Sequence, residues 1–367
     1  MTAPVAAPLP PAEHEAVRGL LGAWALDACP ADESALLERH LADCGPCAAE
    51  AARLRDAAGW LSADEPLDPA PELRSQVLES CLVRRAPLLR VPDWAAPYSA
   101  ETAKLDALLR DLGPSEWLER AEAPWHGGTE YWRPAEVLCH LTAVDGFVGT
   151  AYGLADPVGG LPDVPAGTPW AAVTARTAWL IDAHGGRAPE AVRALWREQT
   201  RALVHTVSLA GPAGGEVPVD YGDFRIPAQD ALVDRAFECW IHADDVARAV
   251  DYPYEPPSAP HLRQMIDLAA RTLPAVLGGR PGAGGEGPPR VLRLVIEGPA
   301  AGEWLIPLDA PELPGDPDPV ASLVVDGLEF CCLAAAHRDP DRMPVGQDGD
   351  AAAVRELLRA APLLSRP

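Results

Sequence analysis

Long segments with apolar residues at helical spacing fill the middle of the chain, and they constrain its fold more than any other feature. They run from about residue 98 to residue 252 and are bounded by proline or glycine, as in SAETAKLDALLRDLG. Apolar residues that recur every three or four positions predict amphipathic helices with one buried face. Several such helices joined by loops predict an antiparallel four-helix bundle.

The sequence changes character on both sides of this region. Residues 13–60 carry three short helical patterns, and a proline-rich linker separates them from a fourth over residues 71–85. Near the other end, RVLRLVIEG, EWLIPL and ASLVVDG alternate as strands do, with helical patterns before and after them. We therefore expect a mostly α protein with three domains: a small helical domain over 1–90, the bundle over 91–255 and a small α+β domain over 256–367.

The charge balance restricts the partners of the chain. Its 367 residues carry a formal net charge of −24, which argues against direct nucleic-acid binding because phosphate contacts require a basic face. No apolar run approaches the roughly 20 residues that span a bilayer. The N-terminus also lacks the basic start and the apolar stretch of a secretory signal. We expect a cytoplasmic protein without a membrane segment.

The stretch ERHLADCGPC places His40, Cys44 and Cys47 close together. His40 and Cys44 share a helical face, and Cys44-Gly-Pro-Cys47 can turn so that both sulfurs meet one ion. Imidazole and thiolate ligands suit tetrahedral zinc, and a structural zinc site requires a fourth ligand. His14 is the favoured candidate, and Cys29 is the alternative. A metal-free redox pair is disfavoured, because such motifs usually follow a strand in a βαβ unit.

This pattern, His40-Leu-Ala-Asp-Cys44-Gly-Pro-Cys47, resembles the core motif of the zinc-binding anti-sigma factor family. The upstream ligand position of that family falls on His14, and the helical pattern from Pro71 fits the helix that wraps a sigma factor. The resemblance covers residues 13 to about 85 and implies a sigma factor as partner. Family members with an upstream cysteine sense oxidants by disulfide formation, so the histidine here argues against such sensing.

A second set of metal-ligand residue types lies in the bundle region. AEVLCHLTAVD contains His140, and FECWIHADD contains Glu238 and His242, four positions apart on one helical face. Two imidazoles and a carboxylate leave a coordination position open, as in catalytic zinc sites, for water or a thiolate. By residue type alone, His140 is more often a buried core histidine than a ligand, and Glu238 fits a solvated charge equally well. Trp132 and Trp240 lie close by in sequence and are candidates for the wall of a ligand cavity.

The segments YWRPAEVLCHLTAVDGFV and AFECWIHADDVARAV resemble the metal-binding helices of the mycothiol-dependent maleylpyruvate isomerases, a branch of the DinB-like four-helix bundles. The resemblance spans about residues 98–362. It implies that His140, Glu238 and His242 bind zinc or another divalent metal, with mycothiol as a further ligand. A looser match in AAHRDP implies a catalytic role for Arg338.

Two functional hypotheses follow from these resemblances. One is an anti-sigma-type transcriptional regulator whose bundle senses a thiol or another small molecule. The other is a mycothiol-dependent isomerase or S-transferase with an accessory zinc domain. The N-terminal zinc motif and the helix after it favour the regulator, whereas the intact triad supports the enzyme. The sequence names neither the sigma factor, the thiol nor a substrate.

Overall fold

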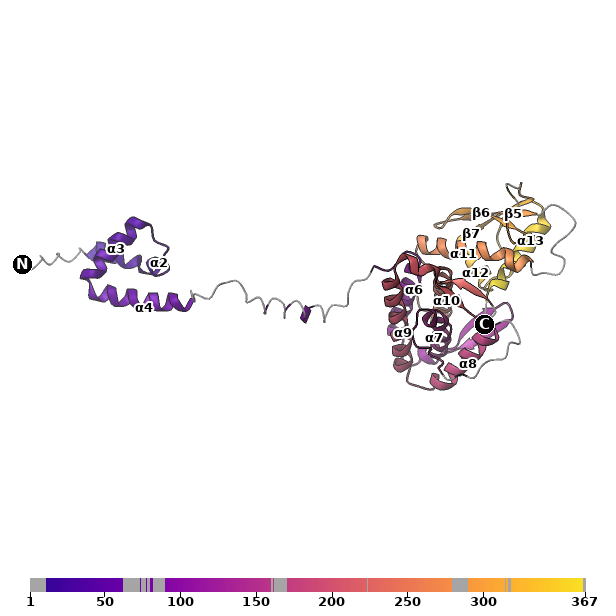
Figure 1. Ribbon diagram of the computed structural model, residues 1–367, viewed down its shortest axis with the longest axis horizontal. Coiled ribbons are helices and arrows are strands. Elements are labelled where there is room, and N and C mark those ends of the chain that lie inside the picture. The colour runs from indigo at the N-terminus through magenta and orange to yellow at the C-terminus, as the bar shows by residue number, and fades with distance from the viewer. Residues whose placement is uncertain are drawn as a thin grey trace, which may run out of the picture. The chain divides into compact units, whose positions relative to one another are not determined.

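The computed structural model describes residues 11–61, 73, 77, 80–81, 90–159, 161, 170–222, 224–278, 290–313, 315 and 318–365. The chain divides into two compact units, Met1–Pro87 and Leu88–Pro367. Figure 1 labels several elements of each unit. None of the described helices combines the length and the apolar character that a membrane span requires.

Short helices build the first unit. They are α1 (Pro11–Gly19), α2 (Leu21–Ala25), α3 (Ala31–Asp43) and α4 (Gly45–Leu61). Val17, Leu21, Leu37 and Ala51 form a small buried core. A core of this size leaves a chain of this length marginally stable, so a bound metal would contribute directly to folding. The fourth helix expected over 71–85 lies mostly outside the described residues, of which positions 73, 77, 80 and 81 are helical.

The second unit contains the expected helical bundle. Its elements are α6 (Ala96–Asp111), α7 (Pro134–Ala151), α9 (Pro189–Ala210) and α10 (Ala228–Ala249), with α8 (Ala171–His184) packed on α7. Helix α7 starts with proline in its first turn, and the Glu136 carboxylate accepts a 2.7 Å hydrogen bond from the Arg133 N–H. Both features favour a helix start. Leu105, Leu138 and Trp196 are fully buried between the helices.

Two β-hairpins, which we do not expect from the sequence, lie between the bundle helices. The first pairs β1 (Ala121–Trp125) with β2 (Gly128–Trp132), and the second pairs β3 (Pro218–Asp220) with β4 (Arg225–Pro227). The first hairpin ends at Trp132, directly before α7. The β1–β2 hairpin therefore determines the position of Trp132 relative to the bundle.

The last third folds as an α+β region. Its elements are α11 (Ala259–Gly278), β5 (Val291–Glu297), β6 (Gly302–Pro307), β7 (Ala321–Asp326), α12 (Gly327–Ala334), β8 (Gly346–Gly349) and α13 (Ala351–Ala360). The sheet order is β6-β5-β7-β8, in which β5 and β7 are parallel and the other neighbours antiparallel. The three expected strands correspond to β5, β6 and β7, so the predicted fold class, mostly α with a small sheet, is confirmed.

One hydrophobic core joins the bundle to the α+β region. Tyr98 and Trp240 of the bundle belong to the same buried cluster as Leu273 of α11, Leu294 of β5 and Phe330 of α12. Because the apolar faces are shared, these two regions form a single compact unit.

Candidate metal centres

The first cluster is assembled by three helices of the N-terminal unit. His14 lies on α1, His40 lies in the last turn of α3, and Cys47 lies in the first turn of α4. Helix α3 ends at Asp43, and the extended backbone of the next residue, Cys44 (φ −121°, ψ 94°), turns the chain into α4 while its N–H donates to the His40 carbonyl. The short Gly-Pro connection thus brings Cys44 and Cys47 to the same side.

The donor atoms of this cluster suit one ion. One donor atom from each of His14, His40, Cys44 and Cys47 lies within 4.8 Å of those of the others. Cys47 Sγ is 3.7 Å from His14 Nε2, and the buried Nε2 of His40 has no hydrogen-bond partner among the described residues. Ligands about 2.0–2.3 Å from a tetrahedral zinc lie roughly 3.3–3.8 Å apart, so a small contraction completes the site. Two imidazoles and two thiols form a closed structural set.

Electrostatics also favour a cation in this cluster. Burial raises the pKa of the Cys47 thiol, and the neighbouring Cys44 raises it further. Two adjacent thiolates are unfavourable without a counter-charge, whereas a divalent cation reverses this balance and deprotonates both. Cys29 lies apart from the cluster, with its sulfur 3.7 Å from the Leu20 carbonyl. The geometry therefore places His14, rather than Cys29, beside the other three residues.

The second cluster joins two long helices of the bundle. His140 lies in the middle of α7, and Glu238 and His242 lie one turn apart on α10. One donor atom from each of the three lies within 4.8 Å of those of the others, and His140 Nε2 is 3.6 Å from Glu238 Oε2. His140 is 1% exposed, so its ring cannot rely on water for hydrogen bonds. This is a three-ligand set that leaves coordination positions for a further ligand.

Both histidines of the triad have a polar neighbour at Nδ1. His140 Nδ1 lies 3.1 Å from Thr177 Oγ1, which leaves Nε2 to face Glu238. His242 Nδ1 lies 3.5 Å from the Asp245 carboxylate. Metal-binding histidines commonly use one nitrogen for such an outer contact and the other for the ion. Trp132 stacks on the His140 ring with centroids 4.8 Å apart, so it forms one wall of this cluster.

Burial of His140 and the charged neighbours of Glu238 keep these two residues in the protonation states that bind metal. Burial lowers the pKa of His140 to about 4, so the imidazole is neutral at pH 7. Burial alone would raise the pKa of Glu238, but Arg235 and His140 outweigh it and hold that pKa well below its usual range. The buried Arg235 donates to Glu238 Oε2 at 2.6 Å and also contacts Oε1. Neutral histidine and ionised glutamate are the ligating forms.

Asp245 links the triad to the α+β region. It is fully buried, and it lies 2.8 Å from His337 Nε2 and 2.6 Å from Arg248 Nη2. His337 follows α12, so the contact spans 92 residues of sequence. The sequence did not predict the contact between Asp245 and His337, because His337 has no ligand-like spacing to any other histidine. The local signals lay in α10, where Glu238 and Asp245 are each within one turn of His242.

Two pockets adjoin these residues. A small one, about 40 Å³, is lined by Glu238, His242, Phe237 and Ile241 and by residues of the α+β region. A larger one, about 450 Å³, is lined by Asp245, His337, Pro124, Ala249, Arg120, Glu122 and Arg248. Pro124 borders both, so a ligand at the metal position has a polar cavity close by.

The remaining predicted site residues lie elsewhere. Trp240 packs in the hydrophobic core against Phe237, with ring centroids 5.9 Å apart. Arg338 makes a two-pronged ion pair with Glu329 of α12, at 2.8 and 3.1 Å. Of the two tryptophans, Trp132 contacts both triad histidines.

Comparison with known proteins identifies two regions of the chain. Residues 98–247 match the family model "Mycothiol maleylpyruvate isomerase N-terminal domain", and residues 15–48 match the family model described as "Putative zinc-finger". Crystal structures of the mycothiol-dependent maleylpyruvate isomerase, and of a histidine-to-alanine mutant of it, are among the solved structures that match. Each is 17% identical over 70% of this chain and 93% of the solved chain, with TM-scores of 0.45 and 0.42 respectively. No curated protein matches.

By these matches, the N-terminal unit is similar to a zinc finger, and the helical bundle is similar to the N-terminal domain of the isomerase family. More particularly, the zinc-finger match contains His40, Cys44 and Cys47, and the match in the bundle contains His140, Glu238 and His242. Both resemblances drawn from the sequence are confirmed at this level.

Proposed function

We propose that the chain is a cytoplasmic anti-sigma-type transcriptional regulator, with zinc in its N-terminal unit and a thiol-responsive metal site in its bundle. The observation that carries this proposal is the cluster of His14, His40, Cys44 and Cys47. It joins α1, α3 and α4 and leaves no coordination position for a substrate, so its role is structural. All eight cysteines are free thiols, which suits a reducing compartment.

Exposed apolar side chains after the zinc cluster support a protein partner for this unit. Trp60, at the end of α4, is 89% exposed, and Leu73 and Val77 are 52% and 53% exposed. Leu73, Val77 and the exposed Cys81 are helical positions spaced four residues apart, the spacing of one face of a helix. An apolar helix face of this kind binds in a groove of a partner protein. The proposed partner is a sigma factor.

Co-purification from the native host tests the regulatory role. We expect the zinc-loaded full chain to recover a sigma factor and to inhibit transcription by polymerase that carries it. Cys44→Ser/Cys47→Ser should recover none, whereas Cys29→Ser should behave as wild type because Cys29 lies outside the cluster. A folded, zinc-loaded chain that captures no sigma factor would contradict the proposal.

The bundle supplies the proposed sensor. His140, Glu238 and His242 would hold a divalent metal, and a low-molecular-weight thiolate would take a free coordination position. In cobalt-substituted protein, addition of mycothiol should produce a thiolate charge-transfer band. His242→Ala should abolish the band, and His205→Ala, on the exposed side of α9, should retain it. Absence of a band in the cobalt-loaded wild type would rule out thiol binding.

An enzyme is the second candidate, because all three triad residues lie together as a catalytic metal site requires. In this alternative, the chain is a mycothiol-dependent isomerase or S-transferase, and Arg338 would contribute to substrate binding. Turnover of a maleyl or epoxide-type substrate with mycothiol would favour the enzyme. Thiolate binding without turnover would favour the sensor.

A further inference from the structure

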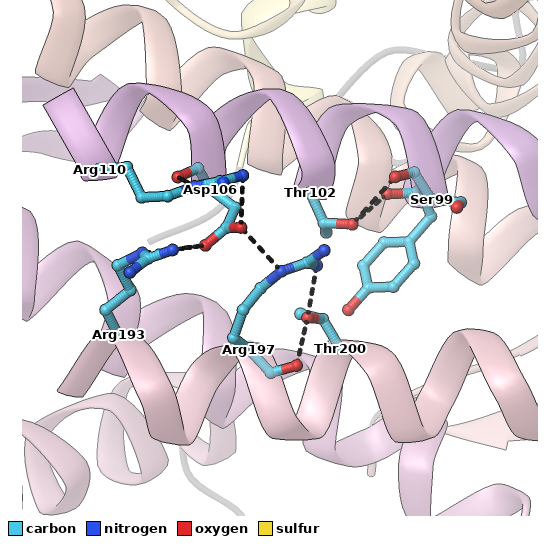
Figure 2. Close-up of polar contacts among 8 residues, drawn as sticks. Ser99, Thr102, Asp106, Arg110, Arg193, Arg197 and Thr200 are labelled. Atoms are coloured by element: carbon cyan, nitrogen blue, oxygen red, sulfur yellow. Dashed lines mark hydrogen bonds and ion pairs between the residues drawn. The ribbon is translucent and has the colours of Figure 1, made fainter. Parts of the chain in front are cut away.

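Three arginines surround one buried carboxylate on the helices α6 and α9, which do not carry the metal triad (Figure 2). Asp106 of α6 has a side chain only 4% exposed. Its Oδ1 accepts hydrogen bonds from Arg193 Nε and Nη2 at 2.9 and 2.6 Å. Its Oδ2 accepts from Arg110 Nη2 at 3.2 Å and lies 3.2 Å from Arg197 Nε.

The charges of this group do not balance. Arginine stays protonated in proteins, so three guanidinium groups and one carboxylate leave a surplus of two positive charges. The Arg193 and Arg197 side chains are only 25% and 19% exposed, so water screens their mutual repulsion poorly. Elsewhere in the second unit, Arg271 and Arg290 each have two carboxylate partners. The surplus contrasts with a chain whose net charge is −24.

Each of the three guanidinium groups also keeps an unused donor. Arg197 Nη1 donates to Thr200 Oγ1 at 3.1 Å, and Arg110 Nε donates to the Asp106 carbonyl. Within the described part of the chain, this leaves Nη1 of Arg110, Nη1 of Arg193 and Nη2 of Arg197 without a protein acceptor. One arginine of α9 paired with Asp106 would already join α6 to α9. An ion pair between the two helices therefore does not account for all three arginines.

We propose that Arg110, Arg193 and Arg197 form a binding site for a phosphate group on the face shared by α6 and α9. A phosphate monoester or inorganic phosphate carries about 1.5 to 2 negative charges at pH 7, which is close to the surplus. Guanidinium groups bind phosphate oxygens through paired N–H donors. Asp106 holds the arginines in place from the buried side, and Arg110, 60% exposed, marks the side from which the ligand enters.

Calorimetric titration of the full chain with inorganic phosphate, in chloride buffer at constant ionic strength, tests this site. We expect saturable binding of one phosphate, weakened at least tenfold by Arg193→Gln or Arg197→Gln. Arg355→Gln, at an exposed position of α13, should bind as wild type. His242→Ala should also bind as wild type, which separates this site from phosphate bound at a metal.

Two further arms complete the experiment. Because Arg110 is largely exposed, Arg110→Gln should stay folded and still bind several-fold more weakly, even where the buried substitutions impair folding. Titration with glycerol phosphate in place of inorganic phosphate shows whether an esterified phosphate fits the site. Acetate should bind the protein much more weakly than either phosphate compound. Absence of saturable binding by the wild type, or equal binding by wild type and Arg110→Gln, would overturn the proposal.

Discussion

At the residue scale, we expect the orientation of His242 to depend on Asp245, a buried carboxylate one turn further along α10 and 3.5 Å from its Nδ1. Because Asp245 lies behind Nδ1, it favours the tautomer that presents Nε2 to an ion. We predict that Asp245→Asn weakens metal binding at the triad about 10- to 100-fold. Chelator competition on the full chain measures this affinity, and the ¹⁵N shifts of His242 report the tautomer.

Asp244→Asn is the matched control for this prediction. Asp244 is the adjacent residue, but its carboxylate points to Arg248 at 3.2 Å and is 35% exposed. The control should bind metal as tightly as the wild type. Equal affinities for the wild type and Asp245→Asn would show that Asp245 does not orient the ligand.

A second buried carboxylate should give the bundle a characteristic pH dependence. Burial raises the pKa of Asp145 to about 7, although Arg235 and a 2.6 Å hydrogen bond from Tyr98 oppose the change. A raised pKa stabilises the folded state fully below the unfolded-state pKa, near 4, and this stabilisation is lost as the pH rises through 7. Asp145→Asn removes the titration.

We therefore predict that the wild type loses roughly 2–4 kcal/mol relative to Asp145→Asn between pH 4 and pH 8. Urea unfolding of both metal-free proteins at the two pH values measures the difference. Comparison with the variant cancels the opposite contribution of His140, whose lowered pKa costs stability as the pH falls below about 6.5. A constant difference between the two proteins across this range would contradict the assignment.

At the element scale, the N-terminal helices depend on the zinc cluster, because their core contains only a few buried side chains. A chelator, or Cys44→Ser/Cys47→Ser, should remove hydrogen-exchange protection from α1, α3 and α4. Protection of α7 and α10 should survive the cysteine substitutions, since those helices share a separate and larger core. Retained protection of α3 and α4 in the cysteine variant would mean that the helices fold without metal.

The elements also show how far the sequence alone could lead. Helical spacing predicted the bundle helices and the four-residue separation of Glu238 and His242, because both are local properties of one helix. The β1–β2 hairpin and β8 carry little apolar alternation; β8 reads GQDG and is exposed throughout. Their pairing depends on neighbouring strands. The contact of His337 with Asp245 likewise depends on how the α+β region packs, which no local pattern encodes.

At the scale of the whole molecule, the chain carries two sets of metal-ligand residues in two compact units. One set offers two imidazoles and two thiols, and the other offers two imidazoles and one carboxylate. The different ligand sets suit a structural ion in the first unit and an accessible ion in the second. Because the two sets lie in separate units, loss of one ion should not affect the other.

Metal content of the full chain, purified without chelators, tests this central claim most directly. We predict two equivalents in the wild type, and one equivalent each in Cys44→Ser/Cys47→Ser and in His140→Ala/His242→Ala. Combining the two sets of substitutions should leave none. Fewer than one equivalent in the wild type, or loss of both ions from a single pair of substitutions, would contradict two independent metal centres.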